Sequence, residues 1–299
     1  MTTLSAAAPP LRTTQRITPR RVMLHMFLIC IAGAWLLPLG WALFTSFRPY
    51  EETARRGYVS WPEQLTLDNY SAALEQGDLV THFNNTIIIV VPALLLTLLL
   101  ASMAAFVFAR FSFRGNVAML LLFTAGNLLP PQVIIMPLVN AFRSIPLPTF
   151  MDSSGTLLDS YWGVGLLHVG FQVGFCVFVL SNYLKLLPLE IVEAAEVDGA
   201  SMWQQYWHVI LPLSRPPLAA LATLQFTWMY NDFFWALVLM VSGSKRPITS
   251  ALDNLRGSFF ADNNLVAAAT VLIAIPTVVV YLMLQRQFVR GLTVGATKG

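Results

Sequence analysis

The chain alternates long apolar runs with shorter polar segments. Six of the runs reach about 20 residues, the length that a helix needs to cross the hydrocarbon core of a bilayer. They lie at residues 22–47, 86–109, 116–139, 161–182, 217–241 and 264–285. Apolar runs of this length, without a polar residue at every second position, favour helices over the strands of a membrane barrel. We therefore predict an all-α membrane protein with six spans between residues 22 and 285.

The composition agrees with this class of protein. Hydrophobic residues make up 56% of the 299-residue chain and charged residues 11%, against roughly 25% charged residues in soluble domains. Lys and Arg do not cluster on a polar face, so we expect no nucleic-acid partner. Cys30 and Cys176 lie in apolar runs without the spacing of a metal or redox site, and the four histidines are scattered singly. We expect neither a metal site nor a catalytic residue.

The first 21 residues hold four arginines and no acidic residue, which predicts a disordered basic tail. The apolar run that follows is too long for the core of a secretory signal peptide, so we expect it to remain as the first span. In a six-span chain, eleven of the 18 Lys and Arg residues lie on one side, in residues 1–21, 110–115, 183–216 and 286–299. Positive residues are enriched in cytoplasmic loops. We therefore predict that the basic tail and the C-terminal tail, residues 286–299, are both cytoplasmic.

The first outer loop, residues 48–85, carries six acidic residues beside its three arginines. We expect a folded or surface-lying external segment, with Trp61 and Tyr70 at the level of the lipid headgroups. Prolines within or at the edges of the spans should kink these helices, although membrane helices in general tolerate proline, so a functional role for the kinks stays open. These prolines are Pro38, Pro92, Pro130, Pro131, Pro137 and Pro276.

One acidic residue, Asp232, lies inside an apolar run. A charge at the centre of a membrane helix costs on the order of 2.5–3.5 kcal/mol, so this carboxylate should face the bundle interior or an aqueous cavity. Two interpretations stay open. Asp232 either pins helices together by hydrogen bonds or lies on a substrate path together with Trp228 and Asn231. A proton relay is disfavoured because the other spans offer no second buried carboxylate and no Lys or Arg partner.

The loop between the fourth and fifth runs, residues 183–216, predicts two short helices with a bend between them. Gly199 can adopt the left-handed conformation that ends the first helix. Ser201 and Gln204 have the spacing of a capping box, which predicts a second helix from there to about His208. Small side chains at or near the bend would let the surface of another protein approach closely. A hairpin that anchors the loop in the headgroups fits the composition as well.

Seven residues of this loop follow a fixed spacing: E-A-A, three intervening residues, Gly, nine intervening residues, Val, one intervening residue, and Leu-Pro. They are Glu193, Ala194, Ala195, Gly199, Val209, Leu211 and Pro212. This pattern resembles the EAA signature of the permease subunits of binding-protein-dependent ABC importers, with Val209 in place of the usual isoleucine. The resemblance implies the type I importer permease fold with six transmembrane helices, in a bacterial cell membrane.

In that family the bend is a coupling helix that docks on a separate ATPase subunit. The resemblance therefore implies a set of residues at this contact: Glu193, Ala194, Ala195, Asp198, Gly199, Ala200, Leu211 and Pro212. The sequence contains no GxxxxGK[ST] loop, so it lacks the phosphate cradle of an ATPase. We expect no cofactor on this chain, no enzymatic activity of its own, and ATP and Mg²⁺ bound by the partner.

Two further stretches, residues 285–299 and Asn231-Asp232-Phe233, resemble carbohydrate-uptake permeases of the maltose type. The resemblance implies that the C-terminal tail lies at the ATPase interface through Gly291, Gly295, Lys298 and Gly299. It also implies three kinds of protein partner: a second homologous permease, an ATPase dimer and an extracytoplasmic sugar-binding protein. The outer loop at 242–263 is similar to the one that reaches toward the binding protein, and it contains Lys245, Arg246 and Arg256.

Other functions remain as alternatives. An importer of polyols or glycerol-phosphate-like solutes would carry the same signature. An ion-coupled secondary transporter would require a network of ionisable residues within the spans, and we find one acid there. An intramembrane enzyme is disfavoured because the sequence contains neither HExxH nor GxSxG.

Overall fold

The computed structural model describes residues 18–126, 130–255 and 262–293. Within these residues, four helices are long and apolar enough to cross a membrane. They are α1 (Pro19–Ser46), α4 (Leu79–Arg110), α7 (Tyr161–Leu184) and the part Asn263–Gln285 of α14 (Asn263–Thr293). The pair Met202–Leu213 and Arg215–Tyr230, bent by 71°, gives a fifth span if it crosses as one. The all-helical membrane fold is confirmed, and the count of six spans stays a prediction.

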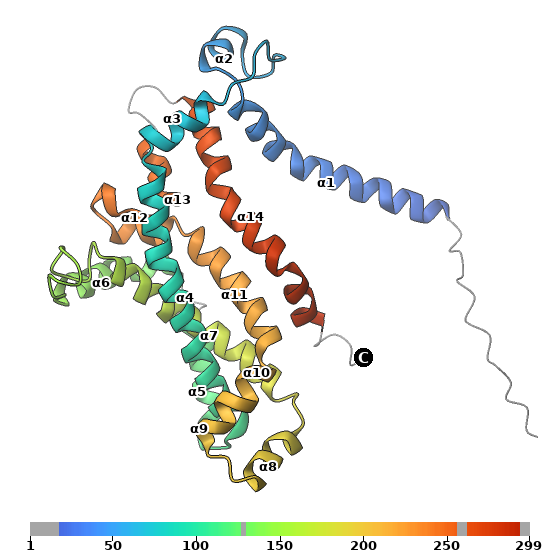
Figure 1. Cartoon of the computed structure of the whole chain (residues 1–299), viewed down its shortest axis with the longest axis vertical. Coiled ribbons are helices and arrows are strands. Elements are labelled where there is room, and N and C mark those ends of the chain that lie inside the picture. The colour runs from blue at the N-terminus through green and yellow to red at the C-terminus, as the bar shows by residue number, and fades with distance from the viewer. Residues whose placement is uncertain (1–17, 127–129, 256–261, 294–299) are drawn as a thin grey trace, which may run out of the picture.

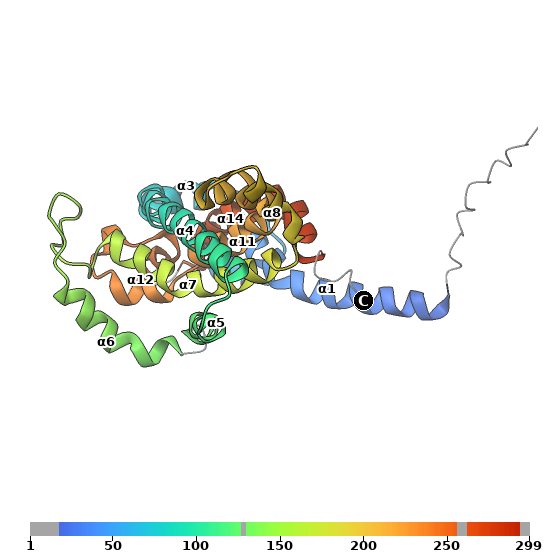
Figure 2. The same ribbon diagram turned by 90° about the horizontal axis from the view of Figure 1, so that it is seen from below.

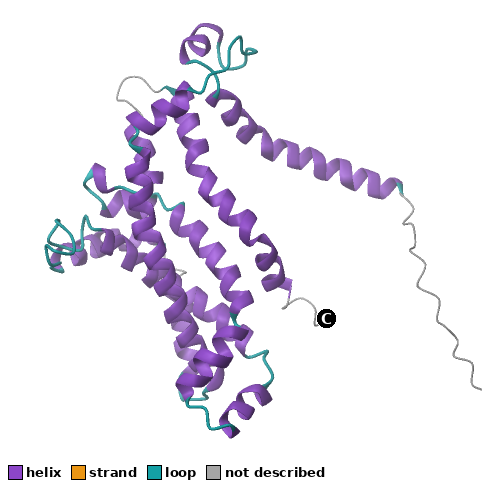
Figure 3. Ribbon diagram, in the orientation of Figure 1, coloured by secondary structure: helices purple, strands orange, loops and turns teal. Residues whose placement is uncertain are grey.

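Shorter helices lie between these spans, and the described residues contain no strand (Figure 3). They are α2 (Tyr50–Arg56), α3 (Asp68–Gln76), α5 (Asn116–Ala125), α6 (Pro131–Ser144), α8 (Leu189–Val197), α9 (Met202–Gln205), η2 (Tyr206–Ile210), α10 (Leu211–Leu213), α11 (Arg215–Tyr230), α12 (Phe234–Leu239), η3 (Gly243–Lys245), α13 (Ile248–Ala251) and η4 (Leu252–Leu255). Figure 1 shows α2 and α3 at one end of the molecule and α8 and α9 at the other.

The centre of the molecule is the packing of α4 along α7, with α11 and α14 beside them (Figure 1). Small residues on α4 allow the close approach. Ala101 and Ala105 are fully buried in one apolar cluster with Cys176, Val177 and Leu180 of α7. Small side chains let helix backbones approach each other in a membrane, where van der Waals packing replaces the hydrophobic effect between helices.

α1 stands apart from this bundle. It leans away from the other helices and meets them near its C-terminal end (Figures 1 and 2), where Thr45 and Ser46 are buried. Most of its apolar side chains are exposed, and Trp35 is 76% exposed. Because a helix this apolar is unfavourable in water, these side chains must be covered by lipid or by another subunit.

The third predicted span is not one helix. α5 ends at Ala125, and α6 begins at Pro131 after an extended Pro130. Proline lacks an amide hydrogen and disfavours the helical conformation in the residue before it, so two successive prolines begin a helix more readily than they continue one. The run at 116–139 therefore forms two segments, of which α5 is too short to cross a bilayer alone. The prolines inside the long helices are Pro38, Pro92 and Pro276.

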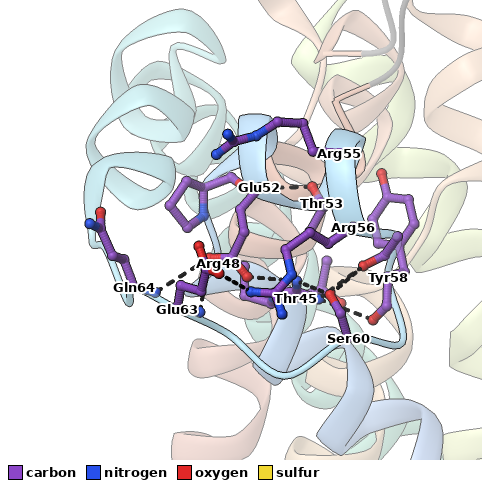
Figure 4. Close-up of polar contacts among 12 residues, drawn as sticks. Thr45, Arg48, Glu52, Thr53, Arg55, Arg56, Tyr58, Ser60, Glu63 and Gln64 are labelled. Atoms are coloured by element: carbon purple, nitrogen blue, oxygen red, sulfur yellow. Dashed lines mark hydrogen bonds and ion pairs between the residues drawn. The ribbon is translucent and has the colours of Figure 1, made fainter.

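The segment between α1 and α3 folds around the fully buried side chain of Arg48 (Figure 4). Its guanidinium donates to Glu52 Oε1 and to Ser60 Oγ, each at 2.8 Å. The other Glu52 oxygen accepts from the backbone amides of Glu63 and Gln64. The hydrogen bond from Arg48 holds the pKa of the Glu52 carboxyl below its ordinary value. These contacts give the short helix α2 a fixed position.

This outer segment is folded, as expected, and its external location stays a prediction. Asn264 of α14 fastens it to the bundle by accepting a hydrogen bond from the Thr53 hydroxyl at 3.1 Å. Tyr70 packs inward instead of facing the headgroups, because its hydroxyl lies 2.6 Å from Ser46 Oγ. Trp61 is 85% exposed, so it alone of the two aromatic residues is free to reach the membrane surface.

Candidate functional site

A sharp bend joins α8 to α9 at the end of the molecule opposite α2 (Figure 1). Gly199 has φ +78°, the left-handed conformation that glycine adopts without strain. The Ala200 amide donates to the Ala195 carbonyl at 2.9 Å, and the Gly199 amide donates to the Glu196 carbonyl at 3.0 Å. This pair of hydrogen bonds is the Schellman motif, which ends a helix and reverses the chain. The predicted bend is present in the predicted place.

The helix after the bend begins as predicted but ends later. The amide of Ser201 donates to Gln204 Oε1 and the amide of Gln204 donates to Ser201 Oγ, which completes the capping box. The predicted end near His208 is wrong, because the chain continues through the π-helical turn η2 and α10. The wider turn relieves the clash that Pro212 would make with the preceding helical turn. The change of direction into α11 comes at Ser214.

Four of the eight residues assigned to ATPase coupling are exposed: Glu193, Ala194, Asp198 and Gly199. We use the term coupling bend for residues 193–200. Its side chains Glu193, Ala194, Glu196 and Asp198 are exposed, Val197 is 88% exposed, and Ala195 and Ala200 are half-buried. Val192, just before it, is buried and packs α8 onto the bundle. Leu211 and Pro212 lie away from this surface, half-buried in α10. The bend therefore offers a small exposed surface with one prominent apolar side chain.

A pocket of about 350 Å³ lies where α7, α11 and α12 meet. Three polar side chains line it: His168 and Gln172 from α7, and Asp232. The sequence predicted that Asp232 lies inside a membrane helix. It lies instead in the break between α11 and α12. Its carboxylate accepts from the backbone amides of Trp235 and Ala236, each at 3.2 Å, and lies 3.7 Å from His168 Nε2. It therefore both fastens the start of α12 and faces the pocket.

Four aromatic rings and the side chain of Leu167 form the remaining walls of this pocket. Phe171 pairs with Trp235, with ring centroids 5.5 Å apart, and Phe175 pairs with Trp228 at 5.6 Å. Of the three residues predicted for the substrate path, Trp228 and Asp232 thus share one pocket. Asn231 does not join them, since it is exposed and its amide nitrogen donates to the backbone carbonyl of residue 227 at 2.8 Å.

Sequence reasoning missed His168 and Gln172, although a signal was present. They are two polar residues in the middle of an apolar run and lie four positions apart, a spacing that places two side chains on the same face of a helix. Two polar residues on one face of a membrane helix indicate a shared polar environment.

Two basic residues of the loop after α12, Lys245 and Arg246, turn toward the protein. Lys245 Nζ donates to Asp152 Oδ1 at 2.5 Å and to the backbone carbonyl of Asp159 at 3.0 Å. Burial alone would raise the pKa of Asp152, but the hydrogen bonds from Lys245 and Ser154 and the charge of Lys245 together outweigh it, so the pKa lies below its ordinary value. The Arg246 guanidinium donates to the backbone carbonyl of residue 240. Arg256 lies outside the described residues.

The C-terminal residues assigned to the ATPase interface are mostly beyond the described chain. Gly291 belongs to the last turn of α14. Gly295, Lys298 and Gly299 lie outside the described residues.

Comparison with known proteins decides the family. The sequence profile of the family described as binding-protein-dependent transport system inner membrane component matches residues 97–294. The chain belongs to this family. The matched region contains both the coupling bend and the pocket, so these are features of a multi-pass ABC importer permease.

Individual relatives of the permease cover nearly its whole length. The xylose/arabinose import permease of Haloferax volcanii is 31% identical over 91% of this chain and 92% of its own. The diacetylchitobiose uptake permease of Streptomyces coelicolor is 30% identical over 91% of this chain and 87% of its own. Among solved structures, a bacterial ABC transporter involved in import of the acidic polysaccharide alginate aligns with a TM-score of 0.76 and 22% identity. The alignment covers 92% of this chain and all of that one, which confirms the permease fold.

Proposed function

We propose that this chain is the permease subunit of an ATP-driven carbohydrate importer, in which it forms half of the translocation pathway. The exposed coupling bend carries the proposal. A Schellman turn that holds Gly199 at φ +78° and leaves Val197 88% exposed presents a rigid, narrow projection at one end of the helical bundle. Such a projection suits insertion into a cleft of another protein, since few rotatable groups are ordered on binding.

The proposed partners follow from the missing phosphate-binding loop in this sequence and from two exposed surfaces, the coupling bend and the apolar side chains of α1. An ATPase dimer would bind ATP and Mg²⁺ and receive the coupling bend and the C-terminal tail. A second, homologous permease would complete the pathway, and it or lipid would cover the exposed side chains of α1. An extracytoplasmic sugar-binding protein would deliver the solute at the end that carries α2. This arrangement puts the coupling bend and both termini in the cytoplasm of a bacterial cell.

The pocket between α7, α11 and α12 is our candidate for part of the solute path. Aromatic rings offer flat apolar faces, and carboxylate, imidazole and amide groups offer donors and acceptors for hydroxyl groups. Asp232 is the one acidic residue among the described residues that line the pocket, and no Lys or Arg joins it there. A phosphate group in the pocket would face this carboxylate with no Lys or Arg to balance the two negative charges, so the pocket favours a neutral, hydroxyl-rich solute over a glycerol-phosphate-like one. Polyols and sugars both satisfy this condition.

The relatives support carbohydrate as the class of solute. Two permeases that align over about nine-tenths of the chain are named for xylose or arabinose and for diacetylchitobiose. These names differ in the size of the sugar, so the solute of this chain is proposed as a class.

Transport in proteoliposomes tests the proposal. The chain would be purified with its ATPase and second permease, reconstituted, and supplied with its binding protein and radiolabelled sugars from pentoses to oligosaccharides, with glycerol 3-phosphate as the anionic comparison. We expect accumulation of one sugar class that requires both ATP and the binding protein. Uptake that persists without the ATPase subunit would refute the proposal and favour an ion-coupled transporter.

A further inference from the structure

The helix that follows the coupling bend is interrupted by the π-turn η2, Tyr206–Ile210. π-Turns are rare because they pack the helix less well, and they occur often at functional sites. Here the turn directs Tyr206 into the bundle, where it is 2% exposed, whereas Trp203 and Trp207 are 58% and 39% exposed.

Tyr206 makes a buried hydrogen bond to α4. Its hydroxyl lies 2.7 Å from Ser102 Oγ, inside the apolar cluster that also contains Phe106 and Ile210. The hydroxyl of Ser102 itself donates to the backbone carbonyl of Leu99 at 2.9 Å. Since a hydroxyl has a single proton to donate, Tyr206 is the donor in the bond to Ser102 whenever Ser102 donates to Leu99. Removal of either hydroxyl would break the polar contact between η2 and α4 in this cluster.

A second contact joins α4 to the helix before the bend. Arg110 Nη2 lies 2.7 Å from Glu196 Oε1, and these residues are the last of α4 and the second last of α8. Ser102 and Arg110 are eight positions apart, which places them about 12 Å apart along the axis of α4. Together with the apolar packing of Val192 and Ile210 on the bundle, two polar contacts at this separation restrict the tilt of the coupling bend relative to α4 more than one would. The ion pair is partly exposed, so the buried hydrogen bond is the stronger of the two constraints.

We propose that Ser102 and Tyr206 are positioning residues, and that their hydrogen bond transmits the movement of the coupling bend to α4. From α4 the movement reaches α7, which packs along it and carries His168 and Gln172 of the pocket. This inference rests on the proposed function. The bond itself touches neither the solute nor the ATPase.

Two variants test whether this hydrogen bond transmits movement, and each removes one of its hydroxyl groups. They are Tyr206→Phe and Ser102→Ala, each in the reconstituted full complex. We expect assembly and ATP hydrolysis within twofold of the wild type, and solute transported per ATP hydrolysed to fall by about fivefold. The double variant should be no worse than either single one, since both remove the same bond.

The matched control is Tyr230→Phe. Tyr230 is fully buried, and its hydroxyl donates to the Ile273 carbonyl at 3.0 Å, between α11 and α14. This variant also removes one buried tyrosine hydrogen bond, but one without contact to the coupling bend, so its transport per ATP should stay near the wild-type value. Unchanged transport per ATP in Tyr206→Phe and Ser102→Ala overturns the inference, and so does an equal loss in all three variants. Failure of the proposed function has a different signature, because wild-type uptake would then not depend on ATP.

Discussion

Replacing Gly199 by valine should strongly reduce coupled transport while the protein still inserts in the membrane. Gly199 has φ +78°, and a left-handed conformation costs a residue with a side chain about 1–2 kcal/mol, with β-branched residues the least tolerant. Relaxation of this strain would break the two hydrogen bonds of the Schellman motif and turn the bend away from its partner. We expect transport to fall more than tenfold and less ATPase to copurify with the permease.

Two further variants separate strain at the coupling bend from strain in general. A Cβ at Gly199 would meet no atom within 4 Å, so Gly199→Ala should give a smaller loss that comes from the backbone alone. Gly155 has φ +69° and equally open surroundings in the loop before α7, so Gly155→Val imposes similar strain far from the bend and should leave transport near normal. Full transport by Gly199→Val would count against the coupling assignment.

Asp232→Asn should leave the permease assembled and reduce transport by about 10- to 100-fold. Both carboxylate oxygens of Asp232 accept backbone amides at the start of α12, and asparagine keeps one of these acceptors. The variant loses the charge that faces His168 and the pocket, and hydrogen bonds to charged groups contribute about 1.5–3 kcal/mol. Transport measured on quantified, assembled complex in proteoliposomes gives the result.

Asp262→Asn is the control for loss of a helix cap. Asp262 Oδ1 accepts from the amides of Asn264 and Leu265 at the start of α14, as Asp232 does for α12, but it lies outside the pocket. It should transport at close to the wild-type rate. If Asp232→Asn fails to assemble, the residue is a structural pin, and if it transports normally, it is not on the solute path.

The features that local sequence determines were predictable. Glycine at the end of α8 and the pair Ser201 and Gln204 specify a Schellman turn and a capping box whatever the rest of the chain does. The long spans α4, α7 and α14 follow from apolar length alone.

Features that depend on contacts between distant segments were not predictable. The hydrogen bond of Tyr206 joins residues 104 positions apart, and Lys245 turns inward to reach an aspartate 93 positions away. Hydropathy also hides helix breaks, because the residues around Pro130 and Asp232 are apolar enough to read as continuous spans. At Asp232 the helix break is part of the pocket. The sequence identified Asp232 as unusual but did not predict that it lies between two helices.

The sidedness of the coupling bend tests the central claim most directly. In a chain whose native cysteines are replaced by Cys30→Ala and Cys176→Ala, the variant Val197→Cys places one thiol on the bend, and Val59→Cys places one on the outer segment, where Val59 is 86% exposed. A membrane-impermeant maleimide applied to right-side-out and inside-out vesicles reports which side each thiol faces. We predict that the thiol at position 197 reacts from the cytoplasmic side, more slowly when the ATPase is bound, and that the thiol at position 59 reacts from the outside. Reaction of the thiol at position 197 from the outside would contradict the account.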